Sequence, residues 1–263
     1  MKRIGIDAGG SLIKIAYKEG GRLRLKTFPA KQTHEVISWL KMTAPEAALQ
    51  VTGGRAEQIK ADNQSISIFK EFTCVIEGTK YLLSEEKKLP DTDYLLVNIG
   101  TGTSFFHKQK RLSGTGVGGG LFTGLGAIIA GTSDYHSLVD LASKGDRTSS
   151  DLMVSDIYQS SYSPVEASLT AANFGKDQLD QSVSAEDQLA ALTQLIGETI
   201  VLLSSLTANS LDTKEIVMIG GALTGNPLLK QVIGSFESMF DYNLTFLEKG
   251  GHAGAVGALY YDE

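Results

Sequence analysis

The sequence predicts an α/β protein in which one structural unit occurs twice, as two lobes that face each other across a cleft. Two stretches follow the same plan: "IGIDAGGSLIKIAY" at 4–17 and "LLVNIGTGTSFFH" at 95–107. In each, an apolar strand ends in an acid or an amide, glycines and hydroxyl residues form a turn, and a second strand follows. A third strand and then helices continue both copies. This shared order favours an internal duplication over a chance similarity between glycine turns.

Apolar stretches and turn residues define the first lobe, which we expect over residues 1–90. Glycine pairs separate the three opening strands, and Thr33 is the predicted N-cap of an amphipathic helix. The predicted strands cover 4–8, 12–17, 23–28, 47–51 and 66–69, and a second helix covers 72–83. The charged stretch "EEKKLPDTD" at 85–93 has no apolar periodicity, so we place the boundary between the lobes there.

The second lobe, residues 91–263, repeats the three-strand opening and then becomes mainly helical. Ser184 is the predicted N-cap of a long helix that runs to about residue 209 with an apolar stripe along one side. Residues 140–175 are mostly irregular and rich in Ser and Thr, which suits a cover over a substrate. The predicted strands cover 94–99, 103–107, 110–113, 216–219 and 244–247, and the remaining helices end near 129, begin at 227 and cover 253–261.

Composition narrows the class of protein. A net charge of -6 and a pI near 5.3 argue against nucleic acid or a membrane surface as a partner, since both attract a basic face. Apolar stretches such as 199–206 are much shorter than a membrane span, and no leader segment precedes the first strand, so we expect a cytoplasmic protein. The single cysteine, Cys74, excludes an internal disulfide and suits a small core residue. The histidines show no metal-ligand spacing.

The glycine turns predict a site for a polyphosphate. Glycine lets the backbone approach a ligand, and its N–H groups can bind phosphate oxygens. Hydroxyl groups on Ser11, Thr101, Thr103 and Ser104 suit the same oxygens. Asp7 ends a buried strand, where its carboxylate can hold Mg²⁺ directly or through water. With "GTGVGGG" at 114–120 and the glycines after residue 219, we expect both lobes to contact one nucleotide.

Two other nucleotide-binding motifs fit the sequence less well. No G-x-x-x-x-G-K-[ST] sequence occurs, which excludes a Walker-type site. Gly114-x-Gly116-x-x-Gly119, with Asp140 some distance on, matches a dinucleotide fingerprint. That fingerprint belongs to the first βαβ unit of its fold, whereas an antiparallel meander precedes it here, so it ranks second.

Residue types alone leave the catalytic groups open. Lys14 is either a solvated strand residue or a counter-charge for phosphate. Glu71 is either one surface carboxylate among many or a general base whose pKa is raised by partial burial beside two phenylalanines. Arg111 is either a hairpin surface residue or a clamp on the transferred phosphoryl group.

Several motifs taken together resemble one family. "GIDAGGSLIKI", "VTGG", "IFKEF", "VNIGTGTS", "RLSGTGVGGG", "GDR", "LTAANFG", "IGGAL" and "GGHAGAVGALY" occur in order along essentially the whole chain. This series is similar to that of type II pantothenate kinases of staphylococci and bacilli. The resemblance implies a duplicated actin-like (ribonuclease H-like) ATPase fold of the hexokinase type, with a nucleotide bound between two lobes.

The resemblance also implies roles for individual residues. Glu71 matches the family's general base, and Arg111 matches the arginine that contacts pantothenate and the transferred phosphate. Asp7 would hold Mg²⁺ through water. The positions that match nucleotide-contacting ones are Asp7, Ala8, Gly9, Gly10, Ser11, Leu12, Ile13 and Lys14 in the first loop, Thr101, Gly102 and Ser104 in the second, and Gly119, Gly120, Leu121, Phe122, Thr123, Tyr135 and Gly221. Two positions depart from the family pattern, with Ser11 where Thr is common and Gly221 where relatives can carry Ser.

The implied activity is transfer of the γ-phosphoryl group of ATP to pantothenate, which gives 4′-phosphopantothenate in the first step of coenzyme A synthesis. Mg²⁺ is the implied cofactor. The family implies a homodimer, to which the long helix at 185–209 contributes either an interface or core packing. Two alternatives remain at this point: a kinase of the same fold that acts on a sugar such as N-acetylglucosamine, and a non-enzymatic nucleotide switch of the actin and Hsp70 type.

Overall fold

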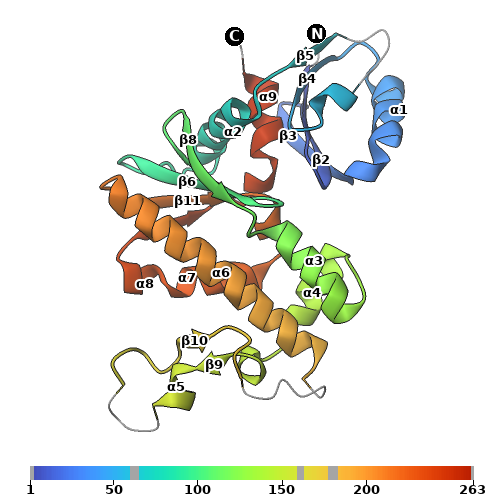
Figure 1. The fold of residues 1–263 in the computed structure, drawn as a ribbon. Helices are drawn as coiled ribbons and strands as arrows, with labels where there is room; N and C mark the ends of the chain where they lie inside the picture. Colours follow the sequence, from blue (N-terminus) through green and yellow to red (C-terminus); the bar gives the residue numbers. More distant parts are fainter. Residues whose placement is uncertain (1–2, 60–64, 159–162, 177–182, 262–263) are drawn as a thin grey trace.

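Two five-stranded sheets form the centre of the protein in a computed structural model that describes residues 3–59, 65–158, 163–176 and 183–261 (Figure 1). The first sheet contains β1 (Arg3–Ala8), β2 (Leu12–Glu19), β3 (Arg22–Pro29), β4 (Ala48–Thr52) and β5 (Ile66–Ile68). The second contains β6 (Tyr94–Ile99), β7 (Thr103–His107), β8 (Lys110–Thr115), β11 (Glu215–Ile219) and β12 (Asn243–Phe246). A separate two-stranded sheet pairs β9 (Leu152–Met153) with β10 (Thr170–Ala172).

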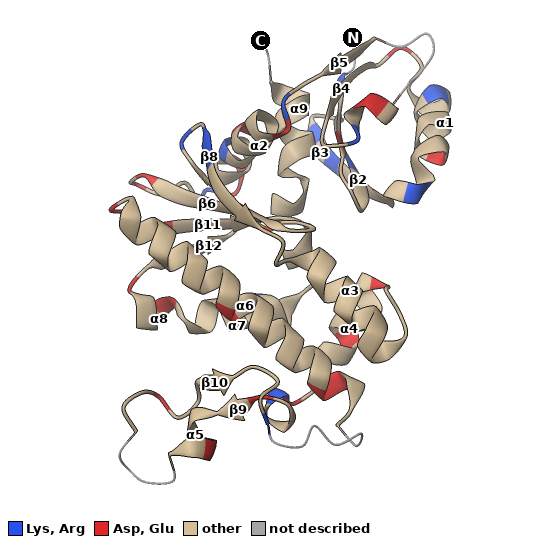
Figure 2. Ribbon diagram, viewed as in Figure 1, with Lys and Arg blue, Asp and Glu red and all other residues tan. Residues whose placement is uncertain are grey.

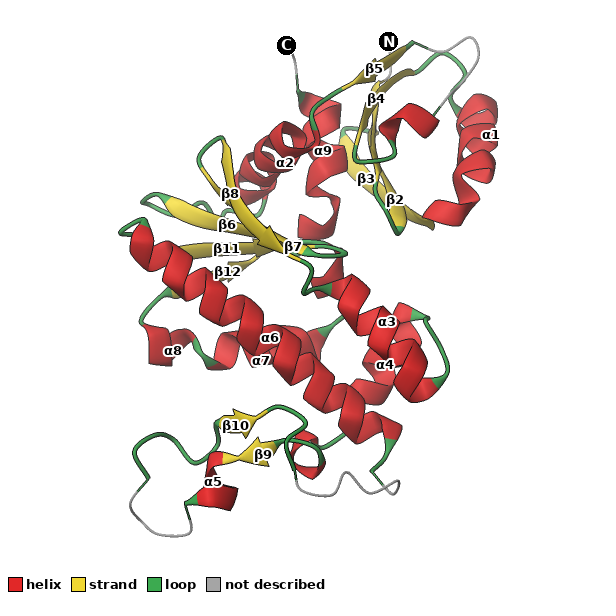
Figure 3. Ribbon diagram, viewed as in Figure 1, coloured by secondary structure: helices red, strands yellow, loops and turns green. Residues whose placement is uncertain are grey.

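Helices lie against both sheets (Figure 3). The α-helices are α1 (Thr33–Thr43), α2 (Glu71–Glu85), α3 (Gly119–Ala130), α4 (Tyr135–Ala142), α5 (Val154–Ile157), α6 (Ala185–Ser210), α7 (Pro227–Ser235), α8 (Glu237–Phe240) and α9 (Ala253–Tyr260). Short 3₁₀ helices are η1 (Ala30–Gln32), η2 (Ala56–Gln58), η3 (Arg147–Ser149), η4 (Gly221–Leu223) and η5 (Gly250–His252). Each strand and helix that the sequence predicts is present, with bounds that shift by one or two residues.

The two large sheets have the same topology, which confirms the predicted duplication. Their strand orders are β3-β2-β1-β4-β5 and β12-β11-β6-β7-β8, so each has an antiparallel three-strand meander followed by two parallel strands. The first strands also share a burial pattern, with the residue before last only partly buried in both. Those two residues are Asp7 and Asn98.

Helices α2 and α9 pack against each other at backbone distance. A Cβ atom placed on Gly78 would lie 1.8 Å from the carbonyl oxygen of Ala253, and one on Gly257 would lie 1.8 Å from that of Cys74. Helix α9 also packs on β1, where Gly5 leaves room for the backbone of Ala255. The last helix of the chain is therefore in contact with the first strand, and the division into lobes at residues 90 and 91 stays a prediction.

Helix α6 is mainly a core helix. Ser184 caps it as predicted, by accepting a hydrogen bond from the N–H of Asp187 at 3.1 Å. It is long and apolar enough to cross a membrane, but 67% of its most apolar window is buried inside the protein. Figure 2 shows few charges along it. Leu202 and Leu206 are exposed near its end. Packing against α4 and α7 explains most of the predicted apolar stripe.

Two local details differ from the sequence prediction. Thr33 is not an N-cap: it is the first residue of α1, and its hydroxyl donates to the carbonyl oxygen of Ala30 at 2.8 Å. The reason is that η1 already turns the chain before α1 begins. Residues 140–175 contain more structure than predicted, because the end of α4, η3, β9, α5 and β10 lie in this region.

Candidate active site

The first glycine turn places an acid and a base side by side. In the β1–β2 hairpin, Asp7 pairs with Lys14, and Lys14 Nζ lies 3.8 Å from Asp7 Oδ2. Both side chains are largely buried, with exposed fractions of 14% and 17%. The N–H of Gly9 closes the turn by donating to the carbonyl oxygen of Leu12 at 3.0 Å. Ala8 and Ile13 are core residues, so only their backbone can face a ligand.

The second glycine turn meets the first. Ser11 Oγ lies 3.1 Å from Thr101 Oγ1, although these residues follow strands of different sheets. In the second turn, the N–H of Gly100 donates to the carbonyl oxygen of Gly102 at 2.8 Å, which closes a bend that is one residue shorter than the first. The structure therefore brings the two predicted phosphate loops together.

The carboxylate of Asp7 fits between two glycines, Gly53 and Gly254, that are not among the predicted site residues although both belong to motifs shared with the family. A Cβ on Gly53 would lie 2.7 Å from Oδ1, and one on Gly254 would lie 2.8 Å from Oδ2. Gly53 also has φ +96°, which disfavours any other residue. One sequence signal was available, because Gly53 comes just after the apolar strand predicted at 47–51. In the structure this strand, β4, runs parallel to β1 and pairs Thr52 with Asp7. Burial raises the pKa of Asp7, and Lys14 partly offsets this.

The donor set around Asp7 fits a Mg²⁺ ion that arrives with a nucleotide. Sites for phosphoryl transfer bind Mg²⁺ through one or two carboxylates, with phosphate oxygens and water as the other ligands. Asp7 supplies such a carboxylate beside hydroxyl and amide groups. Within the described residues, no group of three or more His, Cys, Asp or Glu side chains could hold a metal. The protein ligands here would therefore be completed by phosphate and water.

Glu71 is coupled electrostatically to this acid–base pair. It is the first residue of α2 and comes directly after the short loop that follows β5. The pKa of Glu71 is raised, mainly by desolvation and then by the charge of Asp7, while Lys14 lowers it. A carboxylate with a raised pKa, open to solvent and next to the phosphate loops, is suited to accept a proton near neutral pH.

Arg111 connects the second turn to the helix that carries Glu71. From β8, its Nε donates to Ser104 Oγ at 3.3 Å. Its guanidinium carbon lies 5.4 Å from the centre of the Phe72 ring, a cation–π contact across the two halves. Phe72, the neighbour of Glu71, also meets Phe106 edge-on. The sequence does not reveal Phe72 as a partner of Arg111, because no local pattern links two residues so far apart.

The predicted nucleotide segment at 119–123 is folded against the second turn. The N–H groups of Gly119 and Gly120 donate to the carbonyl oxygens of Gly100 and Thr101, at 2.9 and 2.8 Å. These two amides are therefore already bonded within the protein and do not offer free N–H groups to a nucleotide. A nucleotide contact at Gly119 and Gly120 stays a prediction. Phe122 is a core residue.

Two other predicted positions on α3 also make contacts within the protein. Leu121 packs against the core of the second half, and Thr123 bonds to the backbone of its own helix.

Gly221 brings a third segment to the first turn. It begins η4, directly after Gly220, whose φ of +116° turns the chain out of β11. A Cβ on Gly221 would lie 3.6 Å from Lys14 Nζ. Tyr135 is connected to the same 3₁₀ turn, because its hydroxyl donates to the carbonyl oxygen of Ala222.

The dinucleotide alternative is wrong for this fold. The first of the glycines at 114–119 lies within an antiparallel strand, β8, and the others follow it, and among the described residues no parallel βαβ unit begins there. Asp140 is exposed on α4, where it accepts a hydrogen bond from Lys144 at 2.6 Å. Cys74 is buried on α2, as predicted for a core residue.

The fold and the site define a class: an actin-like ATPase fold of the hexokinase type. Solved structures with this fold cover nearly all of the chain. The activator of 2-hydroxyisocaproyl-CoA dehydratase from Clostridium difficile, with bound ADPNP, is 16% identical, with a TM-score of 0.63 over 99% of this chain and 94% of that one. The ROK hexokinase from Thermus thermophilus is 12% identical, with a TM-score of 0.52 over 98% and 97%.

Within this class, the chain belongs to the Fumble family, which it matches over residues 3–261, and its curated relatives are type II pantothenate kinases. The relative from Oceanobacillus iheyensis is 54% identical over 98% of this chain and 99% of its own length. Another from Staphylococcus aureus is 36% identical over 99% and 100%.

Proposed function

We propose that the protein is a pantothenate kinase that transfers the γ-phosphoryl group of ATP to the primary hydroxyl of pantothenate. The product is 4′-phosphopantothenate, the first intermediate on the way to coenzyme A. The single observation that carries the chemistry is the group formed by Asp7, Lys14 and Glu71, which lies beside two facing glycine turns. Family membership supports pantothenate as the alcohol.

Glu71 acts as the general base. As the hydroxyl oxygen attacks the γ-phosphorus, its proton passes to the Glu71 carboxylate, a new O–P bond forms, and the bond from the γ-phosphorus to the bridging oxygen breaks. ADP leaves with that electron pair. The raised pKa of Glu71 makes it a better proton acceptor than an ordinary surface carboxylate.

Cationic groups from both halves stabilise the negative charge on the phosphoryl oxygens. Lys14 approaches from the first turn, and Arg111 from the third strand of the second sheet's meander. Asp7 would hold Mg²⁺, and when bound the ion would neutralise phosphate charge. The hydroxyls of Ser11, Thr101 and Ser104, with free amides of the turns, would orient the phosphates.

The organisation of the enzyme completes this proposal. We propose two lobes, residues 1–90 and 91–263, whose approach excludes water from the phosphoryl group. We also propose a cytoplasmic homodimer. Exposed apolar side chains on α6, Leu202 and Leu206, are compatible with a dimer contact.

A coupled ADP-release assay tests the function. Pantothenate should stimulate ATP turnover in the presence of Mg²⁺, and N-acetylglucosamine should not. Stimulation by the sugar alone would instead favour the sugar-kinase alternative.

Glu71→Gln separates an enzyme from a nucleotide switch. It should retain ATP binding, lose at least about tenfold in kcat, and remove the acidic limb of the pH–rate profile that the raised pKa produces. A switch would hydrolyse ATP without regard to pantothenate, and Glu71→Gln with unchanged turnover would exclude this residue as the base.

A further inference from the structure

We infer that Asn226 is a positioning residue that holds the η4 turn in place for nucleotide binding. The inference rests on the proposed function, because η4 carries the predicted nucleotide contact Gly221. Asn226 itself is almost fully buried, with an exposed fraction of 3%, so it acts through its neighbours rather than on a ligand.

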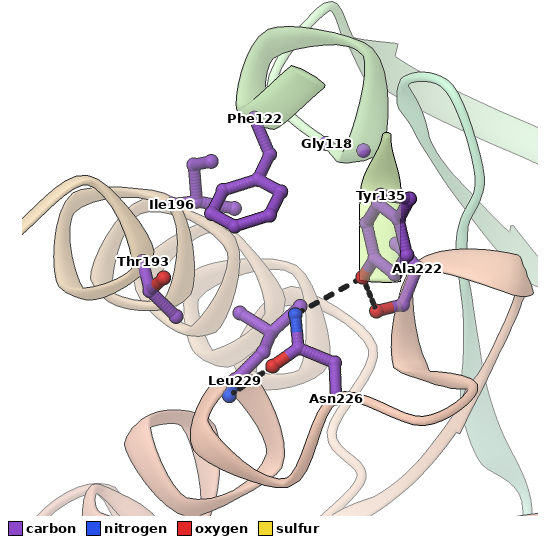
Figure 4. A pocket seen from close by; sticks show the side chains of 9 residues that line it. Gly118, Phe122, Tyr135, Thr193, Ile196, Ala222, Asn226 and Leu229 are labelled. Atoms are coloured by element: carbon purple, nitrogen blue, oxygen red, sulfur yellow. Dashed lines mark hydrogen bonds between the residues drawn. The ribbon is translucent and has the colours of Figure 1, made fainter. Parts of the chain in front are cut away.

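Its hydrogen bonds fix the orientation of its amide (Figure 4). The backbone N–H of Leu229 can only donate, so the atom that it meets at 3.0 Å is the carbonyl oxygen of the Asn226 side chain. This bond caps α7. The amide nitrogen Nδ2 therefore points the other way and donates to the hydroxyl oxygen of Tyr135 at 3.0 Å.

The hydroxyl of Tyr135 links the Asn226 amide to η4. Since its oxygen accepts a hydrogen bond from Asn226, its proton is free to donate to the carbonyl oxygen of Ala222. The relay joins Tyr135, at the start of α4, to two neighbouring segments that are distant from it along the chain: η4 and the N-cap of α7. The Asn226 amide nitrogen sets the direction of these hydrogen bonds, because it can only donate to the Tyr135 oxygen. An acceptor atom in place of this nitrogen would take the Tyr135 proton away from the carbonyl oxygen of Ala222.

The held residue lies at the centre of the predicted nucleotide contacts. Ala222 is buried, and its Cβ would be 3.3 Å from a Cβ placed on Gly119 at the start of α3. Its neighbour Gly221 faces the Lys14 side chain. A shift of Ala222 would therefore move η4 relative to both the second and the first phosphate loop.

The cavity beside the relay is too small for a ligand. Asn226, Tyr135 and Ala222 line it together with Gly118, Phe122 and Ile196, and its volume is about 10 Å³. This is room for roughly one water molecule. The side chains that line this cavity therefore pack against η4 and do not bind a ligand themselves.

The variant Asn226→Asp tests the relay without removing the helix cap. Its carboxylate still accepts from the N–H of Leu229, since Asp and Asn are equally good N-caps, but it cannot donate to Tyr135. The Tyr135 hydroxyl would then donate to the carboxylate and leave the Ala222 carbonyl without its partner. We expect KM for ATP and Kd for ADP to rise by about five- to tenfold, the loss of one buried hydrogen bond, with kcat and KM for pantothenate within about twofold.

Two further variants separate positioning from stability. Ser184→Ala removes an N-cap from α6, far from η4 in the sequence, and should lower the melting temperature while leaving KM for ATP unchanged. Tyr135→Phe removes the middle of the relay and should raise KM for ATP as Asn226→Asp does. The double variant of Tyr135 and Asn226 should be no worse than either single one, because all three break the same chain of bonds.

The inference is overturned if Asn226→Asp loses thermal stability while its Kd for ADP, measured by calorimetry, stays within about 1.5-fold of the unmodified protein. The ADP measurement does not need pantothenate. If the unmodified protein binds ADP but does not phosphorylate pantothenate, the proposed function fails, and the calorimetric comparison still decides the role of Asn226.

Discussion

The two opening hairpins of this protein have the same topology but different chemistry. In the first, the partly buried residue at the end of the strand is Asp7, and its cross-strand partner is Lys14. In the second, the corresponding pair is Asn98 and Ser104, which are neutral. A second carboxylate opposite Asp7 would raise the pKa of both acids and weaken them as ligands of a cation. Duplication thus supplied two equivalent turns, and only one of them carries the acid.

The strongest test of this contrast is Asp7→Asn, which makes the first turn resemble the second. The change is nearly isosteric, so the carboxylate space between Gly53 and Gly254 stays filled. We expect kcat to fall by roughly 10² to 10³, because the variant loses the only carboxylate in the turns that can hold Mg²⁺. Steady-state kinetics over a range of Mg²⁺ concentrations would measure it. Turnover within about threefold of the unmodified protein would contradict the proposed role of Asp7.

The second test concerns the two cationic side chains, Lys14 and Arg111, which come from different strands of the two meanders. The first half supplies Lys14 from its second strand, whereas the second half supplies Arg111 from the third strand of its meander. Arg111→Lys keeps the charge but cannot both bond Ser104 through Nε and stack on Phe72. We expect a roughly 10- to 100-fold loss of kcat/KM for pantothenate. The matched control is Arg24→Lys, an exposed arginine paired with Glu19, which should change nothing. An equal loss in both variants would refute a specific role.

A third test uses pH, because the first hairpin's meander contacts a partly buried histidine. His252 Nε2 lies 2.9 Å from Thr27 Oγ1 on β3. Burial and the charge of Lys14 lower the pKa of His252 from 6.5 to about 4. Between these values the unfolded chain binds a proton that the folded protein does not, so the free energy of unfolding falls as pH falls from about 6.5 to about 4.

Denaturant unfolding of the protein and of His252→Gln at several pH values measures this effect. The difference in free energy of unfolding between the two proteins should change by on the order of 2 kcal/mol between about pH 6.5 and about pH 4. Above about pH 7 this difference should be constant. Curves that stay parallel over the whole range would mean that folding does not lower the pKa of His252.

The smallest effect is expected where the two turns touch. The hydroxyls of Ser11 and Thr101 meet at 3.1 Å, but the contact is exposed, so the bond contributes less than about 1 kcal/mol. Each alanine variant should lower kcat/KM for ATP by only about two- to fivefold. A double-mutant cycle measures their coupling, and fully additive losses would show that the two turns act independently.

Much of this arrangement was predictable because its causes are local. Apolar alternation and glycine pairs identified both hairpins, and the matching order of strands along the chain indicated the duplication that the two sheets share. The stop of a buried strand at an acid made Asp7 a candidate ligand, which stays a prediction, whereas Ser184 was recognisable as a cap from its neighbours. By contrast, the prediction for Thr33 failed because η1 precedes it, and that turn leaves little signal in the sequence.

Amino-acid order alone decided where strands, turns and helices form and which residue types stand at their ends, since hydrogen bonds and burial patterns over a few residues are enough for that. Folding in three dimensions decided the rest. It seated the Asp7 carboxylate between glycines from distant segments, used the amides of Gly119 and Gly120 inside the protein, and joined Tyr135 to Asn226 and Ala222. Such contacts depend on how chain segments far apart in sequence pack together, and no local pattern encodes that packing.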